Sequence, residues 1–221
     1  PHRQEPHSTL IIHTHKAIFV HIPKTAGSSI EVALNALEKT NKGAIDEATG
    51  TFYPVTTGKE KHYDARAYRK RYGRKVWQDY YKFTVVRNPW QRIHSWWWNN
   101  RYITGTLDMP FAEFLRSRLA DPDDLPRALR PQTRWITSAN GKIEMDYTCR
   151  FETIDDDFKA VCKQIGAPVT ELPRVLVENR NPASRPHYTD DYDADLVKLV
   201  ARVYADDIDQ LQYRFGNQTD A

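Results

Sequence analysis

The stretch AIFVHIPKTAGSSIEVALNAL, residues 17–37, decides the fold of this chain. Its first six residues, 17–22, form a largely apolar run rich in β-branched side chains, and Pro23 follows them. This pattern is typical of a buried strand. From Ser28 onward the apolar residues recur at helical spacing, which predicts a helix. The stretch therefore predicts a strand, a short loop and a helix in direct succession.

The loop between this strand and helix has the composition of a phosphate site. A helix start offers outward-pointing backbone N–H groups and the positive end of the helix dipole, and hydroxyls and a lysine add further donors. The nucleoside-triphosphatase motif GxxxxGK[ST] is absent, because the lysine here precedes the glycine. The alternative interpretation is an ordinary strand–helix turn. The residues of the loop are Lys24, Thr25, Ala26, Gly27, Ser28 and Ser29.

A second strand–helix junction follows later in the chain. Residues 82–86, KFTVV, predict a buried strand that ends at Arg87, and Asn88-Pro89 is typical of a helix start. Arg87 and Ser95 are then expected at the sheet edge where open α/β folds bind ligands. Because strands alternate with helices, the predicted fold class is three-layer α/β, with a mostly parallel central sheet and a P-loop-like phosphate-binding loop.

The remaining pattern predicts further elements. Helices are expected from Asp64 to near Gly73, over 109–120, in part of 125–137, from Thr153 to near Gly166 and over about 193–211. A strand is expected over 142–151, and loops are expected over 41–58 and 166–190. His62 would lie where a loop meets a helix, and a solvated surface histidine is the common role in such a charged stretch.

Length and charge limit the possible function classes. The chain has 221 residues, 40% of them hydrophobic, which suits one domain over residues 1–221 with a flexible leader at 1–8. The net charge of +3 suits an anionic ligand better than a general nucleic-acid coat. No run has the length of a transmembrane helix, and no signal-peptide pattern is visible.

The number and spacing of the cysteines indicate the cellular compartment of the protein. Cys149 and Cys162 could pair, but two cysteines without a CxxC motif do not form a disulfide framework. A reduced, cytoplasmic setting is therefore favoured. The alternative is the Golgi lumen, if an N-terminal anchor precedes Pro1.

Two motifs taken together resemble a known family. HIPKTAGSSIE at residues 21–31 and FTVVRNPWQRIHS at residues 83–95 are similar to the sulfotransferases that use 3′-phosphoadenosine 5′-phosphosulfate, PAPS. The similarity is greatest to the carbohydrate branch, which includes heparan 2-O-sulfotransferase-like enzymes and bacterial relatives. Further motifs follow in the family's order: KHYDARAY at 61–68, RPQTRWI at 130–136, CRFE at 149–152 and YADDIDQLQYRF at 204–215.

The resemblance implies a role for each candidate site residue. The loop residues 24–29 would hold the 5′-phosphosulfate, Arg87 and Ser95 would grip the 3′-phosphate, and Arg150 would add a nucleotide contact. His62 matches the family's candidate catalytic base. Lys24 would stabilise the leaving phosphate during in-line sulfuryl transfer, which yields PAP. No metal is implied, and no metal-ligand cluster is visible in the sequence.

The acceptor is expected to be a hydroxyl, most simply that of a saccharide. Aromatic rings suit sugar faces, and arginines suit acidic or sulfated sugars. Candidate pocket residues are Trp96, Trp97, Trp98, Arg134, Trp135, Arg180, Arg185, His187 and Tyr188.

Alternative functions remain open. A sulfotransferase for small-molecule or lipid hydroxyls would keep the same donor motifs. A P-loop-type nucleotide kinase would need Mg²⁺ and a lysine after the glycine. A non-catalytic nucleotide binder is disfavoured by the presence of both Lys24 and His62. A nucleic-acid-binding role is the weakest alternative, because no basic stripe stands out.

Overall fold

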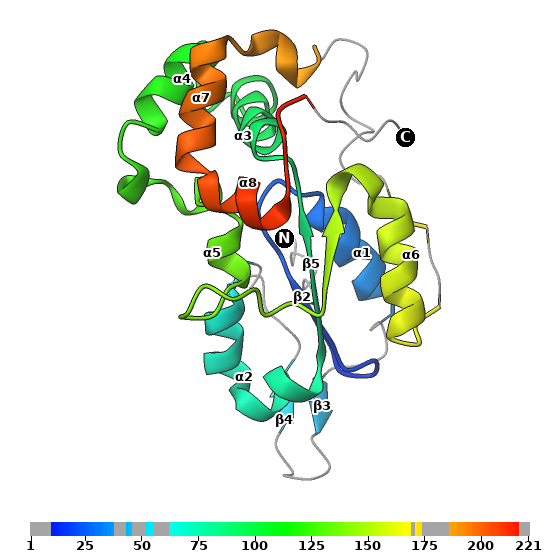
Figure 1. Ribbon diagram of the computed structural model, residues 1–221. Coiled ribbons are helices and arrows are strands. Elements are labelled where there is room, and N and C mark those ends of the chain that lie inside the picture. The colour runs from blue at the N-terminus through cyan, green and yellow to red at the C-terminus, as the bar shows by residue number, and fades with distance from the viewer. Residues whose placement is uncertain are drawn as a thin grey trace, which may run out of the picture.

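A four-stranded sheet in the order β1-β2-β5-β6 forms the centre of the computed structural model (Figure 1). The structure describes residues 10–37, 43–45, 52–54, 62–168, 171–173 and 186–216. Strands β2 (Ala17–Val20), β5 (Tyr81–Val86) and β6 (Tyr147–Arg150) run parallel, and β1 (Ile11–Ile12) pairs antiparallel with β2. The sheet is therefore mixed and mostly parallel, and helices flank it, which agrees with the predicted α/β class.

The pairing of β2 with β5 places the two functional junctions next to each other. Phe19 is in register with Phe83, and their rings stack with centroids 5.2 Å apart. Thr84 is in register with Val20, and its Oγ1 donates to the Val20 carbonyl at 2.7 Å. Because parallel strands end on the same side of a sheet, the loop after β2 and the residue after β5 meet at one edge.

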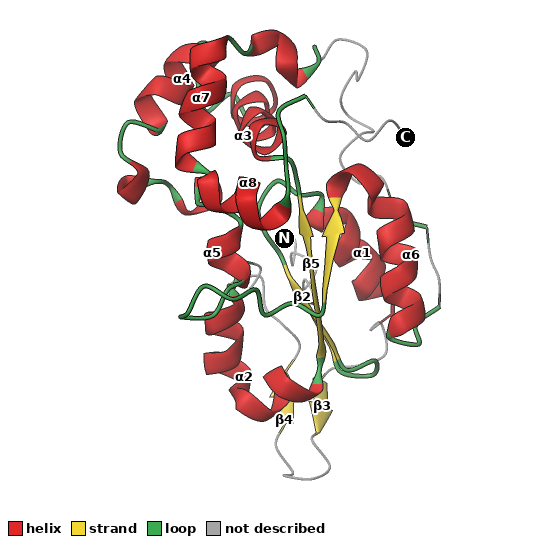
Figure 2. Ribbon diagram, viewed as in Figure 1, coloured by secondary structure: helices red, strands yellow, loops and turns green. Residues whose placement is uncertain are grey.

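Helices cover both faces of the sheet and form a further group beyond its carboxyl edge (Figures 1 and 2). On one side lie α1 (Gly27–Leu37) and α6 (Ile154–Gln164). On the other side lie α2 (Ala65–Asp79) and α5 (Thr133–Ile136). The group beyond the sheet contains α3 (Pro89–Trp98), α4 (Phe111–Arg118) and α7 (Ala194–Val203), and α8 (Ala205–Leu211) follows α7.

Shorter elements connect these helices. A π-helix, Asn99–Ile103, continues α3, and a small hairpin pairs β3 (Gly43–Ile45) with β4 (Phe52–Pro54). Single turns of 3₁₀-helix occupy Pro122–Asp124, Arg127–Leu129, Phe151–Thr153 and Tyr188–Asp191.

The buried apolar side chains form two clusters. The first fills the space between the sheet and its flanking helices. The second lies among α3, α4 and α7, and it contains Trp97, with Trp96 and Trp98 packed against it. Trp96 stacks on Phe114 with ring centroids 5.3 Å apart. The three consecutive tryptophans therefore serve mainly to build the helical group.

Several predicted elements are corrected by the structure. Residues 41–58, predicted to be loop, contain the β3–β4 hairpin. The helix capped by Asp64 does not end near Gly73. It bends there, at φ 85°, and resumes to Asp79, where Val76 and Trp77 are buried. Burial of these two side chains against the sheet stabilises a segment that glycine would otherwise end.

The last predicted helix, 193–211, is two helices. Asp193 caps α7 as expected, since its side chain accepts from the Leu196 N–H at 2.8 Å. The helix breaks at Tyr204, whose hydroxyl donates to the buried Leu129 carbonyl at 2.6 Å. This tertiary contact and the burial of Asp207 outweigh the continuous apolar stripe that predicted one helix.

Smaller differences concern element ends. The first strand ends at Val20 instead of residue 22, the helix expected over 109–120 spans Phe111–Arg118, and the strand within 142–151 spans Tyr147–Arg150. Thr153 occupies the N-cap position of α6 as predicted, but its hydroxyl donates to Asp157 at 2.9 Å and makes no capping hydrogen bond to the helix backbone. Cys149 and Cys162 are both buried, and they do not form a disulfide bond with each other. The predicted leader 1–8 and most of the loop within 166–190 lie outside the described residues.

Candidate active site

The loop between β2 and α1 bends through two left-handed residues. Lys24 has φ 69° and Ala26 has φ 66°. This conformation costs a residue that carries a Cβ about 1–2 kcal/mol, and such strain gathers at ligand sites. The loop then enters the first turn of α1, where the Ser29 N–H donates to the Ala26 carbonyl at 3.0 Å. The chain thus reaches a helix N-terminus directly after a strand, the arrangement that binds anions in other folds.

Two loop residues are held from the core side. Thr25 is fully buried, and its Oγ1 donates to the Ile22 carbonyl at 2.9 Å. A Cβ placed on Gly27 would lie 2.0 Å from Cδ2 and Nε2 of His21. Glycine is therefore needed at this position for space, because its backbone packs directly against the imidazole. Lys24, Ser28 and Ser29 are half-buried.

The imidazole beneath Gly27 is itself fixed. His21 and Glu31 are both buried, and Nδ1 of the histidine lies 2.6 Å from Oε1 of the glutamate. Glu31 belongs to α1, so this contact ties the start of the loop to the helix that the loop enters. The His21 ring also stacks on Phe19 of β2, with centroids 5.5 Å apart.

His62 lies beside this loop although it is 41 residues away in the sequence. Its Nδ1 is 3.4 Å from the His21 carbonyl, and the centroids of the two imidazoles are 4.8 Å apart. Nη2 of Arg127 donates to the His62 carbonyl. The His62 ring is half-buried and meets Trp135 edge-on, with centroids 6.3 Å apart. The structure thus brings the predicted base to the predicted phosphate loop.

Arg87 reaches the same loop from the end of β5. Its Nη1 donates to the Lys24 carbonyl at 3.4 Å, and its Nε donates to Oε1 of Gln91 at 2.9 Å. Its guanidinium carbon lies 3.7 Å from the centroid of the Phe151 ring. These contacts fix the plane of the guanidinium group at the sheet edge. Ser95 is buried on α3, the helix that follows Arg87.

Gln132 holds the backbone of Arg87, and sequence reasoning gave it no role. Its Oε1 accepts from the Arg87 N–H at 2.9 Å, and its Nε2 donates to the Arg87 carbonyl at 2.8 Å. Asp207 in turn accepts from the backbone N–H groups of Gln132 and Thr133, at 2.7 and 2.8 Å. Burial raises the pKa of the Asp207 carboxyl above its ordinary value. The hydrogen bonds and nearby Arg92 oppose this rise but do not cancel it.

Arg150, for which the family resemblance implies a nucleotide contact, is the last residue of β6. Arg150 is in register with Val86, so it lies at the same sheet edge as Arg87. Its guanidinium, however, donates to the Leu211 carbonyl at 2.7 Å and lies 4.7 Å from the centroid of the Tyr213 ring. These contacts tie β6 to the C-terminal segment.

A pocket of about 360 Å³ adjoins His62. Four guanidinium groups and one carboxylate belong to its walls, so its charge is strongly positive. Arg127 and Trp135, which contact His62, are also part of the wall. The lining residues are Asp64, Arg66, Arg127, Arg130, Arg134, Trp135 and Thr137.

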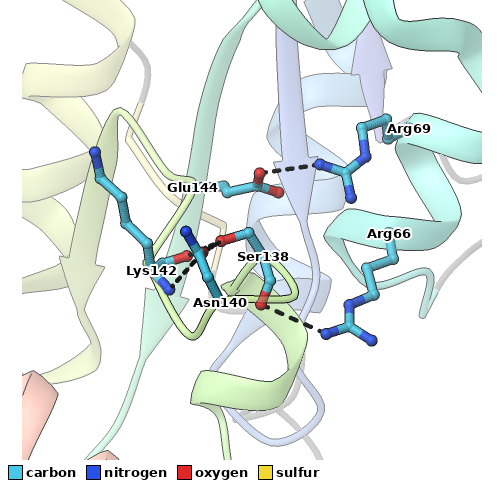
Figure 3. Close-up of polar contacts among 6 residues, drawn as sticks. All are labelled: Arg66, Arg69, Ser138, Asn140, Lys142 and Glu144. Carbon is cyan, nitrogen blue, oxygen red and sulfur yellow. Dashed lines mark hydrogen bonds and ion pairs between the residues drawn. The ribbon is translucent and has the colours of Figure 1, made fainter.

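The rim of this pocket is braced from α2 (Figure 3). Arg66 donates to the Ser138 carbonyl at 3.4 Å, and Arg69 pairs with Glu144 at 3.0 Å. The segment that receives these contacts is a tight turn, in which the Ser138 N–H donates to the Lys142 carbonyl at 2.9 Å. The arginines of α2 are thereby held against the chain that carries Thr137.

The acceptor candidates from the sequence divide into three groups. Arg134 and Trp135 line the pocket, whereas the tryptophans at 96–98 pack in the helical group. Tyr188 is also buried in that group, where its hydroxyl accepts from the Gly216 N–H at 3.0 Å, and His187 contacts Thr189 at 2.5 Å. Arg180 and Arg185 lie outside the described residues.

The described part of the chain contains no group of three or more His, Cys, Asp or Glu residues able to hold a metal ion. Within that part, no helix combines the length and apolarity needed to cross a bilayer.

Comparison with known proteins agrees with this geometry. The sequence model of the sulfotransferase family matches residues 7–214. An uncharacterized protein of Archaeoglobus fulgidus is 28% identical over 101 residues, which are 45% of this chain and 79% of the relative. No solved structure matches. Since the family match spans the loop, Arg87, His62 and the arginine-lined pocket, the chain belongs to the sulfotransferase family, whose members transfer sulfuryl groups to acceptor substrates, generally from PAPS.

Proposed function

We propose that this chain transfers a sulfuryl group from PAPS to a hydroxyl of a saccharide that bears anionic groups. One observation carries the proposal: the phosphate loop, Arg87 and His62 meet at one edge of the sheet, next to a pocket lined by four arginines. The first three match the donor and base positions of the family. The pocket supplies the place and the charge for an acceptor.

The donor side uses Lys24, the loop backbone and Arg87. During in-line transfer, negative charge grows on the oxygen that joins sulfur to the leaving phosphate. In this proposal the Lys24 ammonium and the N–H groups at the start of α1 stabilise that charge. Arg87, with its planar fork of donors, suits the dianionic 3′-phosphate of the nucleotide.

His62 is proposed as the base that takes the proton from the acceptor hydroxyl. A hydrogen bond from Nδ1 to the His21 carbonyl requires the proton on Nδ1, so the neutral ring carries its basic lone pair on Nε2. Arg127 fixes the backbone of the same residue. A neutral imidazole held in one tautomer is suited to general base catalysis near pH 7.

Replacing His62 by alanine tests this role. We expect kcat to fall about 10²-fold or more, the usual contribution of a general base, with little change in the dissociation constant for PAP. The matched control is His15→Ala, because His15 also contacts a backbone carbonyl, that of Ile165 at 3.2 Å, but lies elsewhere. A large loss of PAP affinity in the His62 variant would assign the residue to the nucleotide site instead.

The acceptor side follows from the charge of the pocket. Four arginines face one carboxylate, and that carboxylate, Asp64, already accepts from the Ala67 N–H at 2.8 Å as the cap of α2. Carboxylate or sulfate groups on a sugar would neutralise the excess positive charge of the pocket. Arg127 lies over the Trp135 ring at 5.0 Å, so this ring is partly covered and the arginines dominate recognition.

Removing one pocket arginine should change acceptor binding and leave turnover intact. For Arg134→Ala we expect KM for a sulfated or carboxylated disaccharide to rise about fivefold, the value of one exposed charge pair, while kcat stays unchanged. Arg118→Ala on α4 is the control, since Arg118 is also exposed but is not among the residues that line the pocket. If the uncharged version of the same disaccharide were sulfated equally well, the anionic acceptor would be wrong and a small-molecule or lipid hydroxyl would take its place.

A further inference from the structure

Arg92 on α3 is a buried arginine to which the proposed function assigns no role. Only 3% of its surface is exposed. Its guanidinium donates to three backbone carbonyls: Nε to Pro23 at 3.0 Å, Nη1 to Arg130 at 3.0 Å and Nη2 to Ala128 at 2.8 Å. One side chain therefore contacts both the phosphate loop and the segment that carries pocket arginines.

Burying a charged side chain costs desolvation free energy. Burial lowers the pKa of the Arg92 guanidinium, and nearby Tyr204 and Asp207 oppose that change. Well-packed apolar residues usually stabilise a core at least as well as a buried ion does. The three directed hydrogen bonds therefore point to a role in fixing geometry.

The contact with Pro23 sets the direction of the next N–H group. All described peptide bonds are trans, so the C=O and the N–H of each peptide point to opposite sides. Because the Pro23 carbonyl points to the Arg92 guanidinium, the Lys24 N–H points away from that guanidinium. The next backbone torsion in the chain is the left-handed φ of Lys24, at 69°. The orientation of this first peptide of the phosphate loop thus depends on Arg92.

The other two contacts reach the acceptor side. The carbonyls of Ala128 and Arg130 belong to the turn Arg127–Leu129 and its end, and Arg127 and Arg130 line the pocket. Tyr204 supports the same turn through its hydrogen bond to the Leu129 carbonyl. Both buried side chains therefore support the turn, but Arg92 also contacts the phosphate loop, through the Pro23 carbonyl.

We propose that Arg92 is a positioning residue that aims the Lys24 N–H at the 5′-phosphosulfate group and sets the pocket turn at a fixed place relative to it. The inference rests on the proposed function. It adds that one buried guanidinium aligns the donor loop with the acceptor wall.

The test compares two nucleotides that differ only in the 5′-phosphate. Adenosine 3′,5′-bisphosphate (PAP) and adenosine 3′-monophosphate are titrated into wild type and R92K by calorimetry. Lysine keeps the charge but cannot bind three carbonyls in one plane. We expect R92K to lose PAP affinity about tenfold, the value of a charge-assisted hydrogen bond, and to keep its affinity for the monophosphate.

Y204F is the matched control, because it loosens the same turn without touching Pro23. It should keep the wild-type ratio of the two affinities even if its melting temperature falls. An unchanged ratio in R92K would overturn the role of Arg92 and leave the proposed function standing. A wild type that does not prefer PAP to the monophosphate would instead overturn the proposed function, and this inference with it.

If R92K does not fold, a measurement on the wild type tests whether the Lys24 N–H meets the 5′-phosphate. The amide proton of Lys24 is followed by NMR during titration with each nucleotide. We expect a downfield shift with PAP and none with the monophosphate, because only PAP brings the 5′-phosphate to this N–H. An amide that does not respond to PAP would overturn the proposal.

Discussion

Replacing Lys24 by alanine should lower kcat by about 10²- to 10³-fold, the range observed when one group that stabilises transition-state charge is removed. Lys24 lies in the strained part of the loop, at φ 69°, directly before the helix N-terminus. Its ammonium is expected to act mainly on charge that appears as the sulfuryl group leaves. PAP binding should therefore fall much less than turnover.

The Lys24 result needs two readouts. Turnover is measured with PAPS and a sulfated disaccharide, and PAP affinity is measured by calorimetry. Lys163→Ala on α6 removes an exposed lysine far from the loop and should behave as wild type. Turnover equal to that of wild type in the Lys24 variant would contradict the proposed catalytic role.

Replacing Arg87 by alanine should weaken PAP binding about 100-fold, as expected when one partner of a buried charge pair is truncated. Arg87 as a residue is 7% exposed, and its guanidinium is already held by Gln91 and Phe151, so it is preorganised for a phosphate group. Affinity for AMP, which lacks the 3′-phosphate, should change little. The diagnostic quantity is the ratio of the PAP and AMP affinities.

The control for Arg87 must separate phosphate binding from packing. Arg101 also lies near an aromatic ring, that of Tyr102 at 5.4 Å, and Arg101→Ala removes a looser arginine–aromatic contact on the π-helix that continues α3. Urea unfolding of both variants measures the loss of stability. Equal losses of PAP and AMP affinity in the Arg87 variant would show that the residue supports the fold and does not read the 3′-phosphate.

Local sequence signals were sufficient for the two strand–helix junctions. The β-branched run before Pro23 and the Asn88-Pro89 start of α3 are short-range features, and the structure confirms both. In the structure Asn88 caps α3 by accepting from the Trp90 N–H at 3.1 Å. The rule that parallel strands end at one edge was enough to expect Arg87 at the ligand-binding edge of the sheet, and in the structure Arg87 contacts the Lys24 carbonyl there at 3.4 Å.

Features that depend on distant contacts were not predictable. The break at Tyr204 requires the Leu129 carbonyl, which is 75 residues away, and the helix beyond Gly73 requires burial of Trp77. The pocket gathers exposed arginines from α2 and from the turn near residue 127, and exposed residues have no periodic signal. Arg134 and Trp135 were predicted as pocket residues only because an arginine and an aromatic ring suit an acidic sugar.

The central claim is that this sheet edge binds a nucleotide with a 3′-phosphate as the product of sulfuryl transfer. It is tested most directly by calorimetric titration of the protein with PAP, with AMP and ATP–Mg²⁺ as controls. We predict binding of PAP that is much tighter than binding of AMP and independent of Mg²⁺. Binding of ATP–Mg²⁺ without preference for PAP would contradict the claim and favour a nucleotide kinase.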